Sequence, residues 1–359
     1  MSKKPRYIDD VLRDNSHKDQ DSPPTKTLRS CSAPVARPTA VELDLARRLA
    51  SSSKSVRQEA LTAVQRVLCA AETPLRWPEM RRLWRALFYT LWFADRPVAI
   101  EAVIRRLVRL LEVSADPYLY FRGMLECLVR EWPSIDHHRL DKYYALLTDG
   151  VAAAAAWGVS HGSADDWQAC RCIARIVEEE VFQPLYVDKV HFADDVAAEA
   201  REPPRRGSVG VALHLCDVWV ARILESVPPD ERQHLSFAVD SRCPADMYME
   251  PIVRLFVVET NRAAEARLPT RKRLMARAAQ RVWKVLEARW LTRPPEPVEE
   301  ASWRTHAQEI AQGLFQRASG TGVPDYGRRL LYETVRHLRA AVELPSEVSA
   351  VPLKRKRKA

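Results

Sequence analysis

Residues 77–97 read WPEMRRLWRALFYTLWFADRP, and apolar side chains recur in this stretch every three or four positions. The apolar set is Met80, Leu83, Trp84, Leu87, Phe88, Leu91 and Trp92. Arg81, Arg82 and Arg85 fall on the opposite side of a helix with 3.6 residues per turn. The spacing predicts an amphipathic helix, and Pro78 stands in its first turn, where proline is favoured.

The same helical spacing recurs at 103–111, after Pro97, and at 140–151, after Pro133. Further helices are predicted near 56–71, 117–131, 164–182, 210–225, 246–266, 270–291, 301–318 and 326–342. No run shows the sustained alternation of apolar and polar residues that is typical of a strand. Many helices joined by short proline-bearing turns predict an all-α protein.

Two Trp-Pro pairs, Trp77-Pro78 and Trp132-Pro133, are each expected to precede a helix, and they lie 55 residues apart. This recurrence favours an α-solenoid of degenerate HEAT-like helical pairs. A compact helical bundle is the alternative. Proline-rich segments near 183–209 and 292–300 are expected to be loops.

The two ends of the chain differ in composition from the rest. Residues 1–40 are rich in Ser, Pro, Lys and Asp, which predicts a disordered N-terminal arm. Residues 41–343 are the expected helical-repeat domain, and 344–359 are an expected disordered, basic C-terminal tail. The formal net charge is +9, and the tail supplies much of it through Lys354, Arg355, Lys356, Arg357 and Lys358. This basic run is typical of a nuclear-localisation signal.

Composition also argues against several classes of protein. Only 10 of the 359 residues are glycine, which disfavours the nucleotide-binding α/β folds that need glycine near phosphates. The seven cysteines are odd in number and form no CxxC pair, so we expect free thiols in a reducing compartment. The sequence shows no apolar signal peptide and no apolar run long enough to cross a membrane, so no membrane partner is predicted.

One short motif suggests catalysis. Residues 158–162 read GVSHG and fit the GxSxG pattern, in which Ser160 would be the nucleophile of a hydrolase. That turn requires a preceding strand, whereas residues 151–156 favour a helix, so a helix that ends at Gly158 is the better interpretation. The chain is therefore interpreted as a non-enzyme, with no cofactor and no small-molecule substrate.

A possible metal site is likewise rejected. Asp136, His137, His138 and Asp141 cluster in sequence, but adjacent histidines on a helix point about 100° apart and do not easily share one ion. Asp136 or Ser134 is instead expected to cap a helix, with Arg139 and Asp141 on its surface or between helices.

The strongest local charge lies in residues 262–293, which carry ten basic residues against two glutamates. The predicted contacts with RNA, or with an acidic partner, are Arg271, Lys272, Arg273, Arg277, Arg281 and Lys284. Four of these form an expected stripe at i, i+4, i+8 and i+11 along one helix. Such a stripe is able to follow a phosphate backbone, although a solvated helix face remains the alternative.

Two segments are distinctive: residues 83–97, LWRALFYTLWFADRP, and residues 130–144, REWPSIDHHRLDKYY. Together they resemble the nucleolar ribosomal RNA processing protein 1 family, and residues 210–219 and 328–332 add weaker matches. The signature residues are Trp84, Trp92, Asp95, Trp132, Asp136, Arg139, Asp141 and Lys142. They are expected to be structural or to form a partner surface.

The resemblance implies a non-catalytic nucleolar assembly factor of the large ribosomal subunit precursor. Its expected partners are pre-rRNA, other large-subunit assembly factors and ribosomal proteins, and its expected location is the nucleus and nucleolus. The alternative is a nuclear α-solenoid that connects proteins and has no RNA role.

Overall fold

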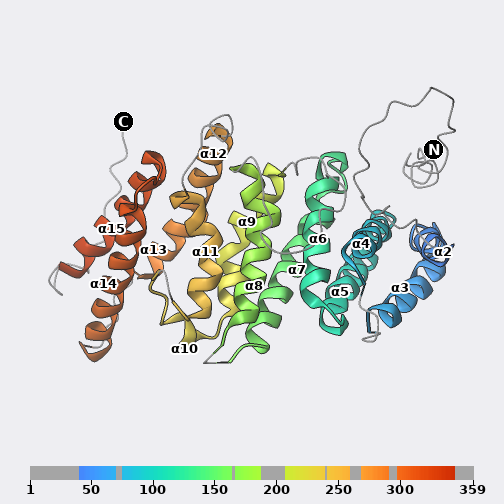
Figure 1. Cartoon of the computed structure of the whole chain (residues 1–359), viewed down its shortest axis with the longest axis horizontal. Helices are drawn as coiled ribbons and strands as arrows, with labels where there is room; N and C mark the ends of the chain where they lie inside the picture. Colours follow the sequence, from blue (N-terminus) through green and yellow to red (C-terminus); the bar gives the residue numbers. More distant parts are fainter. Residues whose placement is uncertain are drawn as a thin grey trace, which may run out of the picture. The chain divides into compact units, whose positions relative to one another are not determined.

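The computed structural model describes residues 40–69, 75–163, 166–186, 207–238, 241–258, 268–290 and 297–343. Within these ranges the chain is helical and contains no β-strand, which confirms the predicted all-α class (Figure 1). The predicted N-terminal arm, the basic C-terminal run at 354–358 and most of the predicted loop at 183–209 lie outside the described residues.

The helices of the first half are α2 (Ala40–Leu49), α3 (Lys54–Cys69), α4 (Trp77–Trp92), α5 (Pro97–Val113), α6 (Pro117–Glu131), the 3-10 turn η1 (Trp132–Ser134), α7 (Leu140–Ser160) and α8 (Gln168–Val177). Those of the second half are α9 (Val209–Val218), α10 (Pro229–Arg232), α11 (Pro244–Val257), α12 (Leu268–Ala278), α13 (Lys284–Trp290), α14 (Pro297–Ser319) and α15 (Asp325–Glu343).

Helices pack in two layers, mostly against their next-but-one neighbours in the chain. In one layer α2 lies on α4, α4 on α6, α6 on α8, and α8 on α11. In the other layer α3 lies on α5, α5 on α7, and α7 on α9, which in turn packs against α12. This two-layer succession of helical pairs is the arrangement of an α-solenoid, in which each pair buries its apolar face against the next.

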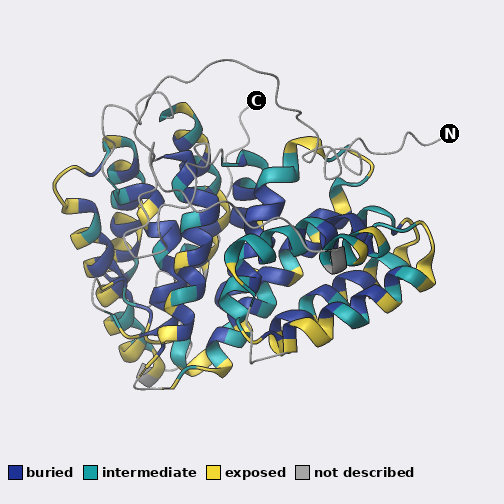
Figure 2. Ribbon diagram, turned by 45° about the vertical axis from the view of Figure 1, so that its right-hand side comes forward, coloured by how far each residue is buried: buried dark blue, intermediate teal, exposed yellow. Residues whose placement is uncertain are grey.

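The buried residues lie on the faces that the helices turn toward their neighbours (Figure 2). In α4 most of the predicted apolar stripe is buried, with Trp84, Leu87 and Leu91 at 1% exposure or less. Tyr89 and Thr90 of the same helix are also buried, because α4 contacts α2, α5 and α6 on several sides. Burial of each large apolar side chain contributes roughly 1.5–3 kcal/mol, so this helix holds its neighbours together.

Buried polar side chains connect the helices through main-chain carbonyls. The indole Nε1 of Trp84 donates to the carbonyl of Tyr120 (2.7 Å), and the hydroxyl of Tyr120 donates to the carbonyl of Leu107 (3.0 Å). Tyr248 on α11 donates to the carbonyl of Ala155 on α7 (2.7 Å). Burial raises the pKa of both tyrosines well above the usual value, so each hydroxyl keeps the proton that it donates.

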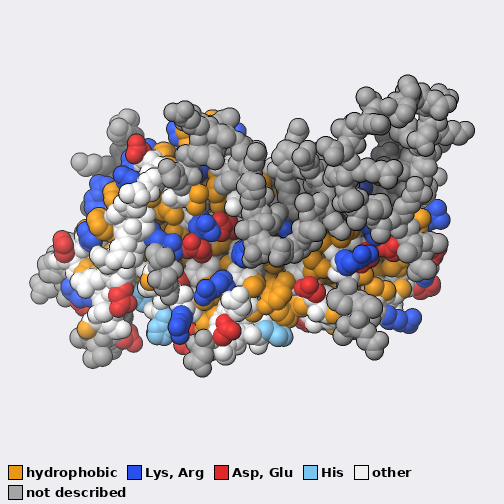
Figure 3. Space-filling model, in the orientation of Figure 1, with side chains coloured by type: hydrophobic (Ala, Val, Ile, Leu, Met, Phe, Trp, Pro, Cys, Tyr) orange, Lys and Arg blue, Asp and Glu red, His pale blue; other side chains and the backbone are white. Residues whose placement is uncertain are grey.

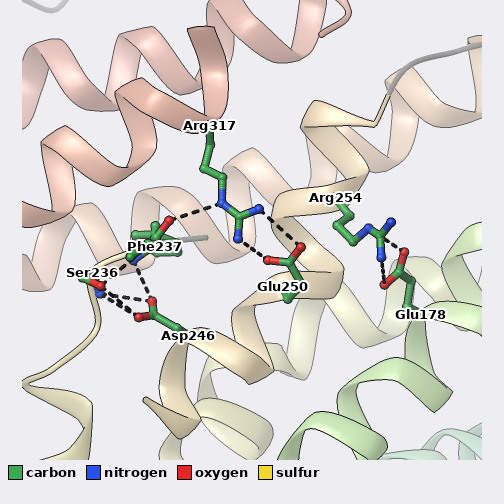
Figure 4. A network of polar contacts seen from close by, with 8 residues as sticks. Glu178, Ser236, Phe237, Asp246, Glu250, Arg254 and Arg317 are labelled. Atoms are coloured by element: carbon green, nitrogen blue, oxygen red, sulfur yellow. Dashed lines mark hydrogen bonds and ion pairs between the residues drawn. The ribbon is translucent and has the colours of Figure 1, made fainter. Parts of the chain in front are cut away.

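A polar network fixes α14 against α11 (Figure 4). Phe237 has a left-handed backbone (φ 58°), and the carboxylate of Asp246 accepts its amide N–H at 2.7 Å. Arg317 of α14 donates to the carbonyl of Phe237 and forms an ion pair with Glu250 of α11. The unusual φ is therefore stabilised by contacts from two helices.

Helix α15 packs on α11 through a glycine. A Cβ atom added at Gly327 would lie 2.2 Å from the carbonyl oxygen of Phe256, closer than any side chain allows. The backbone of α15 therefore meets the end of α11 directly, and α14 and α15 belong to the same packed unit as the preceding helices.

Three helices contain π-helical segments that the sequence did not predict: η2 (Glu178–Phe182), η4 (Trp219–Ile223) and η7 (Ala279–Trp283). A π turn closes hydrogen bonds from i to i+5 and shifts the helical register by one residue. The segment η7 therefore interrupts the regular 3.6-residue spacing on which the stripe predicted for residues 273–284 is based.

Two further predictions are wrong. The helix predicted at 140–151 does begin at Leu140, but neither Ser134 nor Asp136 is its N-cap, because η1 and a turn precede it. Asp136 accepts the amide N–H of Arg139 (3.1 Å) in that turn, while Arg139 itself occupies the N-cap position of α7. The predicted loop at 292–300 is helical from Pro297 onward.

Candidate nucleic-acid interface

The predicted RNA contact Arg271 is buried. Its side chain is 0% exposed, its Nε donates to the carbonyl of Leu255 (2.9 Å), and its Nη2 donates to that of Val258 (2.6 Å). The guanidinium carbon lies 5.2 Å from the ring centre of Tyr186. Arg271 thus holds the last turn of α11 and is not available to RNA, which corrects the prediction.

Arg277 and Arg281 share one carboxylate. Arg277 Nε lies 2.6 Å from Oδ1 of Asp217 on α9, and Arg281 Nε lies 3.4 Å from the same atom. The hydrogen bond to Asp217 raises the pKa of Arg277. The two arginines join α12 and η7 to α9, and one carboxylate neutralises only part of their charge.

The remaining predicted contacts, Lys272, Arg273 and Lys284, are exposed. None of the three forms an ion pair with another described residue. The face drawn in Figure 3 shows basic and acidic side chains interspersed over the described residues. The candidate interface, hereafter the α12 surface, consists of Lys272, Arg273, Arg281 and Lys284, with Arg277 at its edge.

The signature residue Lys142 closes the end of α4. It is buried, and its Nζ donates to the carbonyls of Trp92 and Ala94, both at 2.8 Å. Burial lowers the pKa of Lys142 to about 8, while Asp95, 3.8 Å away, opposes this shift. Lysine near a helix C-terminus satisfies carbonyls that have no partner within the helix, so Lys142 links the two signature segments.

Arg139 and Asp136 reinforce the same junction. Arg139 forms an ion pair with Asp136, and its guanidinium carbon lies 4.7 Å from the ring centre of Trp92. Asp95 and Asp141 are exposed beside it. Lys142, Arg139 and Asp136 of the signature are therefore structural, whereas the carboxylates of Asp95 and Asp141 face solvent.

Trp132 belongs to an aromatic cluster that joins α7 to α9. Its ring centre lies 5.1 Å from that of Tyr144, which lies 4.3 Å from that of His214. His214 also contacts the hydroxyl of Thr148 (2.8 Å). Burial lowers the pKa of His214, so the imidazole is held neutral within the cluster. The weaker family segment at 210–219 thus packs against the stronger one.

The hydrolase alternative is contradicted by the position of Ser160. Gly158, Val159 and Ser160 are the last residues of the long helix α7, so no strand leads into the motif. Helix α7 continues to Ser160, beyond the end predicted at Gly158. A Cβ atom at Gly158 would lie 2.5 Å from the hydroxyl of Tyr248, so the glycine permits close helix packing.

Among the described residues, no group of three His, Cys, Asp or Glu side chains is placed to hold a metal ion. No described helix has both the length and the apolar character needed to cross a membrane. His137 and His138 lie side by side, with ring centres 3.7 Å apart.

Sequence reasoning missed the basic side of α5. Arg105, Arg106 and Arg109 line a groove between α3 and α5, at a distance along the chain from the highly charged segment 262–293. The available signal was the i, i+4 spacing of Arg105 and Arg109, but it lies within a helix whose apolar periodicity dominates.

Comparison with known proteins identifies the family. A family model described as nucleolar protein Nop52 matches residues 40–301. Ribosomal RNA processing protein 1 homolog B of Mus musculus is 28% identical over 189 residues, which are 51% of this chain and 23% of that protein. Homolog B of Homo sapiens is 34% identical over 122 residues (32% of this chain, 16% of that protein), and homolog A of Homo sapiens is 30% identical over 113 residues (30% and 24%).

The matched segments therefore span a quarter or less of these three relatives. Their names agree with the resemblance seen in residues 83–97 and 130–144. Because the Nop52 model covers more than half of the sequence, the chain belongs to the Nop52 family of nucleolar proteins.

Proposed function

We propose that the chain is a non-catalytic nucleolar assembly factor of the large ribosomal subunit precursor. It holds other assembly factors, ribosomal proteins and pre-rRNA together and so supports pre-rRNA processing. Family membership is the observation that carries this proposal, because the Nop52 description is nucleolar and the curated relatives are named for ribosomal RNA processing.

The fold supports a scaffolding mechanism. A two-layer arrangement of helical pairs offers a long surface on which several partners bind without competing. The exposed signature carboxylates Asp95 and Asp141 suit a basic partner segment, and the α12 surface suits an anionic one. The basic run at 354–358, which lies outside the described residues, would add sequence-independent affinity for RNA and direct the chain to the nucleus.

Reversal of two exposed charges on the α12 surface tests the RNA part of this proposal. R273E/K284E is expected to lower the fraction of protein that cosediments with large-subunit precursors by about fivefold, since each lost phosphate contact weakens binding. Arg277 is left in place because it binds Asp217.

The matched control is R171E/R242E, which changes the net charge equally at exposed arginines that form no ion pair with other described residues. Circular dichroism and thermal unfolding establish that both variants are folded. If R273E/K284E and wild type cosediment equally with the precursors, the α12 surface does not contact RNA.

A further inference from the structure

A groove of about 480 Å³ lies between α3 and α5. Three arginines of α5 line it, namely Arg105, Arg106 and Arg109, together with Gln65 of α3 and Glu112 of α5. Three basic side chains against one acidic side chain give this groove an excess of positive charge, which attracts anions.

Arg106 is held rigidly without being neutralised. Its Nη1 donates to Oε1 of Gln58 (3.1 Å) and its Nη2 donates to Oγ1 of Thr62 (2.6 Å), both on α3. Because both acceptors are uncharged, the positive charge of Arg106 stays available to a ligand anion. A guanidinium fixed in advance also loses less conformational entropy on binding.

Arg105 and Arg109 stand one helical turn apart on the exposed side of α5, about 6 Å along its axis. Arg105 forms an ion pair with Glu101, but both side chains are exposed, and such pairs contribute little. Arg109 forms no ion pair with another described residue. Both arginines are thus able to meet successive anionic groups of one extended ligand.

We propose that this groove, hereafter the α5 groove, binds the phosphate backbone of RNA without regard to base sequence. This inference rests on the proposed role in pre-rRNA assembly and names a contact site for it. Guanidinium groups match phosphate oxygens with two parallel hydrogen bonds. The lining contains no aromatic side chain on which a base would stack, so the contact is to the backbone.

An acidic protein segment fits the α5 groove less well. A helix or peptide that docks in a groove anchors itself through apolar side chains in apolar pockets. The apolar lining consists of Ala102, Leu110 and Val113. The side chain of Leu110 is already buried by its neighbours, at 2% exposure. The apolar side chains that stay open to such anchors are the small ones of Ala102 and Val113.

The α5 groove and the α12 surface belong to the same helical layer, which runs through α3, α5, α7, α9 and α12. One RNA that contacts both would gain affinity from the high effective concentration of the second contact. The two sites share no residue, so substitutions in one leave the side chains of the other unchanged.

The test measures binding of the purified full chain to a fluorescein-labelled oligouridylate and to an RNA hairpin of equal length, over a range of salt concentrations. R105E/R109E is expected to weaken binding of both RNAs by at least about tenfold at low salt, and to reduce the slope of log K against log[salt] by about 1.5. R171E/R242E is expected to stay within twofold of wild type. R105Q/R109Q repeats the test if the glutamate variant does not fold.

Unchanged affinity and unchanged salt slope in folded R105E/R109E would overturn the inference, as would failure of the wild-type chain to bind either RNA. Polyglutamate serves as the competing probe. The inference fails if polyglutamate binds wild type more tightly than RNA does, and if R105E/R109E loses polyglutamate binding but keeps RNA binding. An acidic protein is then the ligand.

Cosedimentation distinguishes this outcome from failure of the proposed function. If wild-type protein does not cosediment with large-subunit precursors, the proposed function fails even where RNA binding at the α5 groove is confirmed. If wild type cosediments and R105E/R109E binds RNA normally, only the groove assignment fails.

Discussion

Replacement of Arg271 by alanine is expected to lower the free energy of unfolding by about 3–5 kcal/mol, because a buried charged side chain that donates to two main-chain carbonyls is lost. The carbonyls of Leu255 and Val258 lose their donors, and a cavity opens beside Tyr186. Each buried carbonyl left without a partner costs about 1–3 kcal/mol. Urea unfolding followed by circular dichroism measures the change.

Lys272 provides the matched control, since it is adjacent, basic and exposed. K272A is expected to change the free energy of unfolding by no more than about 0.5 kcal/mol. R271K keeps the positive charge but not the planar fork, so it should fall between the two. Similar small effects of R271A and K272A would contradict the buried position of Arg271.

The second large effect is expected at Lys142. K142A should lower the free energy of unfolding by about 2–4 kcal/mol, because the carbonyls of Trp92 and Ala94 lose their donor at the end of α4. The neighbouring substitution D141A, at an exposed position, should change it by less than about 0.5 kcal/mol. An equal effect of the two substitutions would show that Lys142 does not close α4.

The pH dependence of K142A has a definite sign. The pKa of Lys142 is lowered from its ordinary 10.5 to about 8 in the folded chain, so between these values the unfolded chain binds more protons. Stability that depends on Lys142 therefore rises with pH across this window. The neutral amine still has two N–H groups for the two carbonyls. The difference between wild type and K142A should be constant below pH 7 and should grow toward pH 10.

Helical periodicity made the fold predictable. The spacing of Trp84, Leu87 and Leu91 specified α4, and similar patterns specified its neighbours, because burial of one helix face dominates the energy. Many helices joined by short proline-bearing turns predicted an α-solenoid, in which alternate helices pack in two layers. The π segments were not predictable, since a π turn leaves no distinct pattern in the sequence.

Charge was harder to interpret than apolarity. Arg271 lies in the same basic run as Lys272 and Arg273, and a count of charges treats them alike. Its spacing of four residues from the buried Met275, and seven from Ala278, places it on the apolar face of α12. That spacing was the signal for a buried arginine. The pairing of Arg277 with Asp217 on α9 depends on tertiary packing, and the sequence carried no sign of it.

The same reasoning applies to the signature segments. Lys142 lies four residues before the buried Leu146, on the inner face of α7, and this spacing predicts burial. The target of its amine, the end of α4, is about fifty residues away and becomes visible only in the folded chain. Family resemblance marked these positions as important, whereas the contacts explain what each side chain does.

Purification of the tagged protein, with and without RNase treatment, followed by probing for spacer-containing precursors of both ribosomal subunits, tests the central proposal most directly. Enrichment of large-subunit over small-subunit precursors is the predicted result, with some protein partners lost after RNase. A folded, nuclear protein that retains all of its partners after RNase and enriches no pre-rRNA would contradict the assembly-factor proposal and would identify an adaptor between proteins instead.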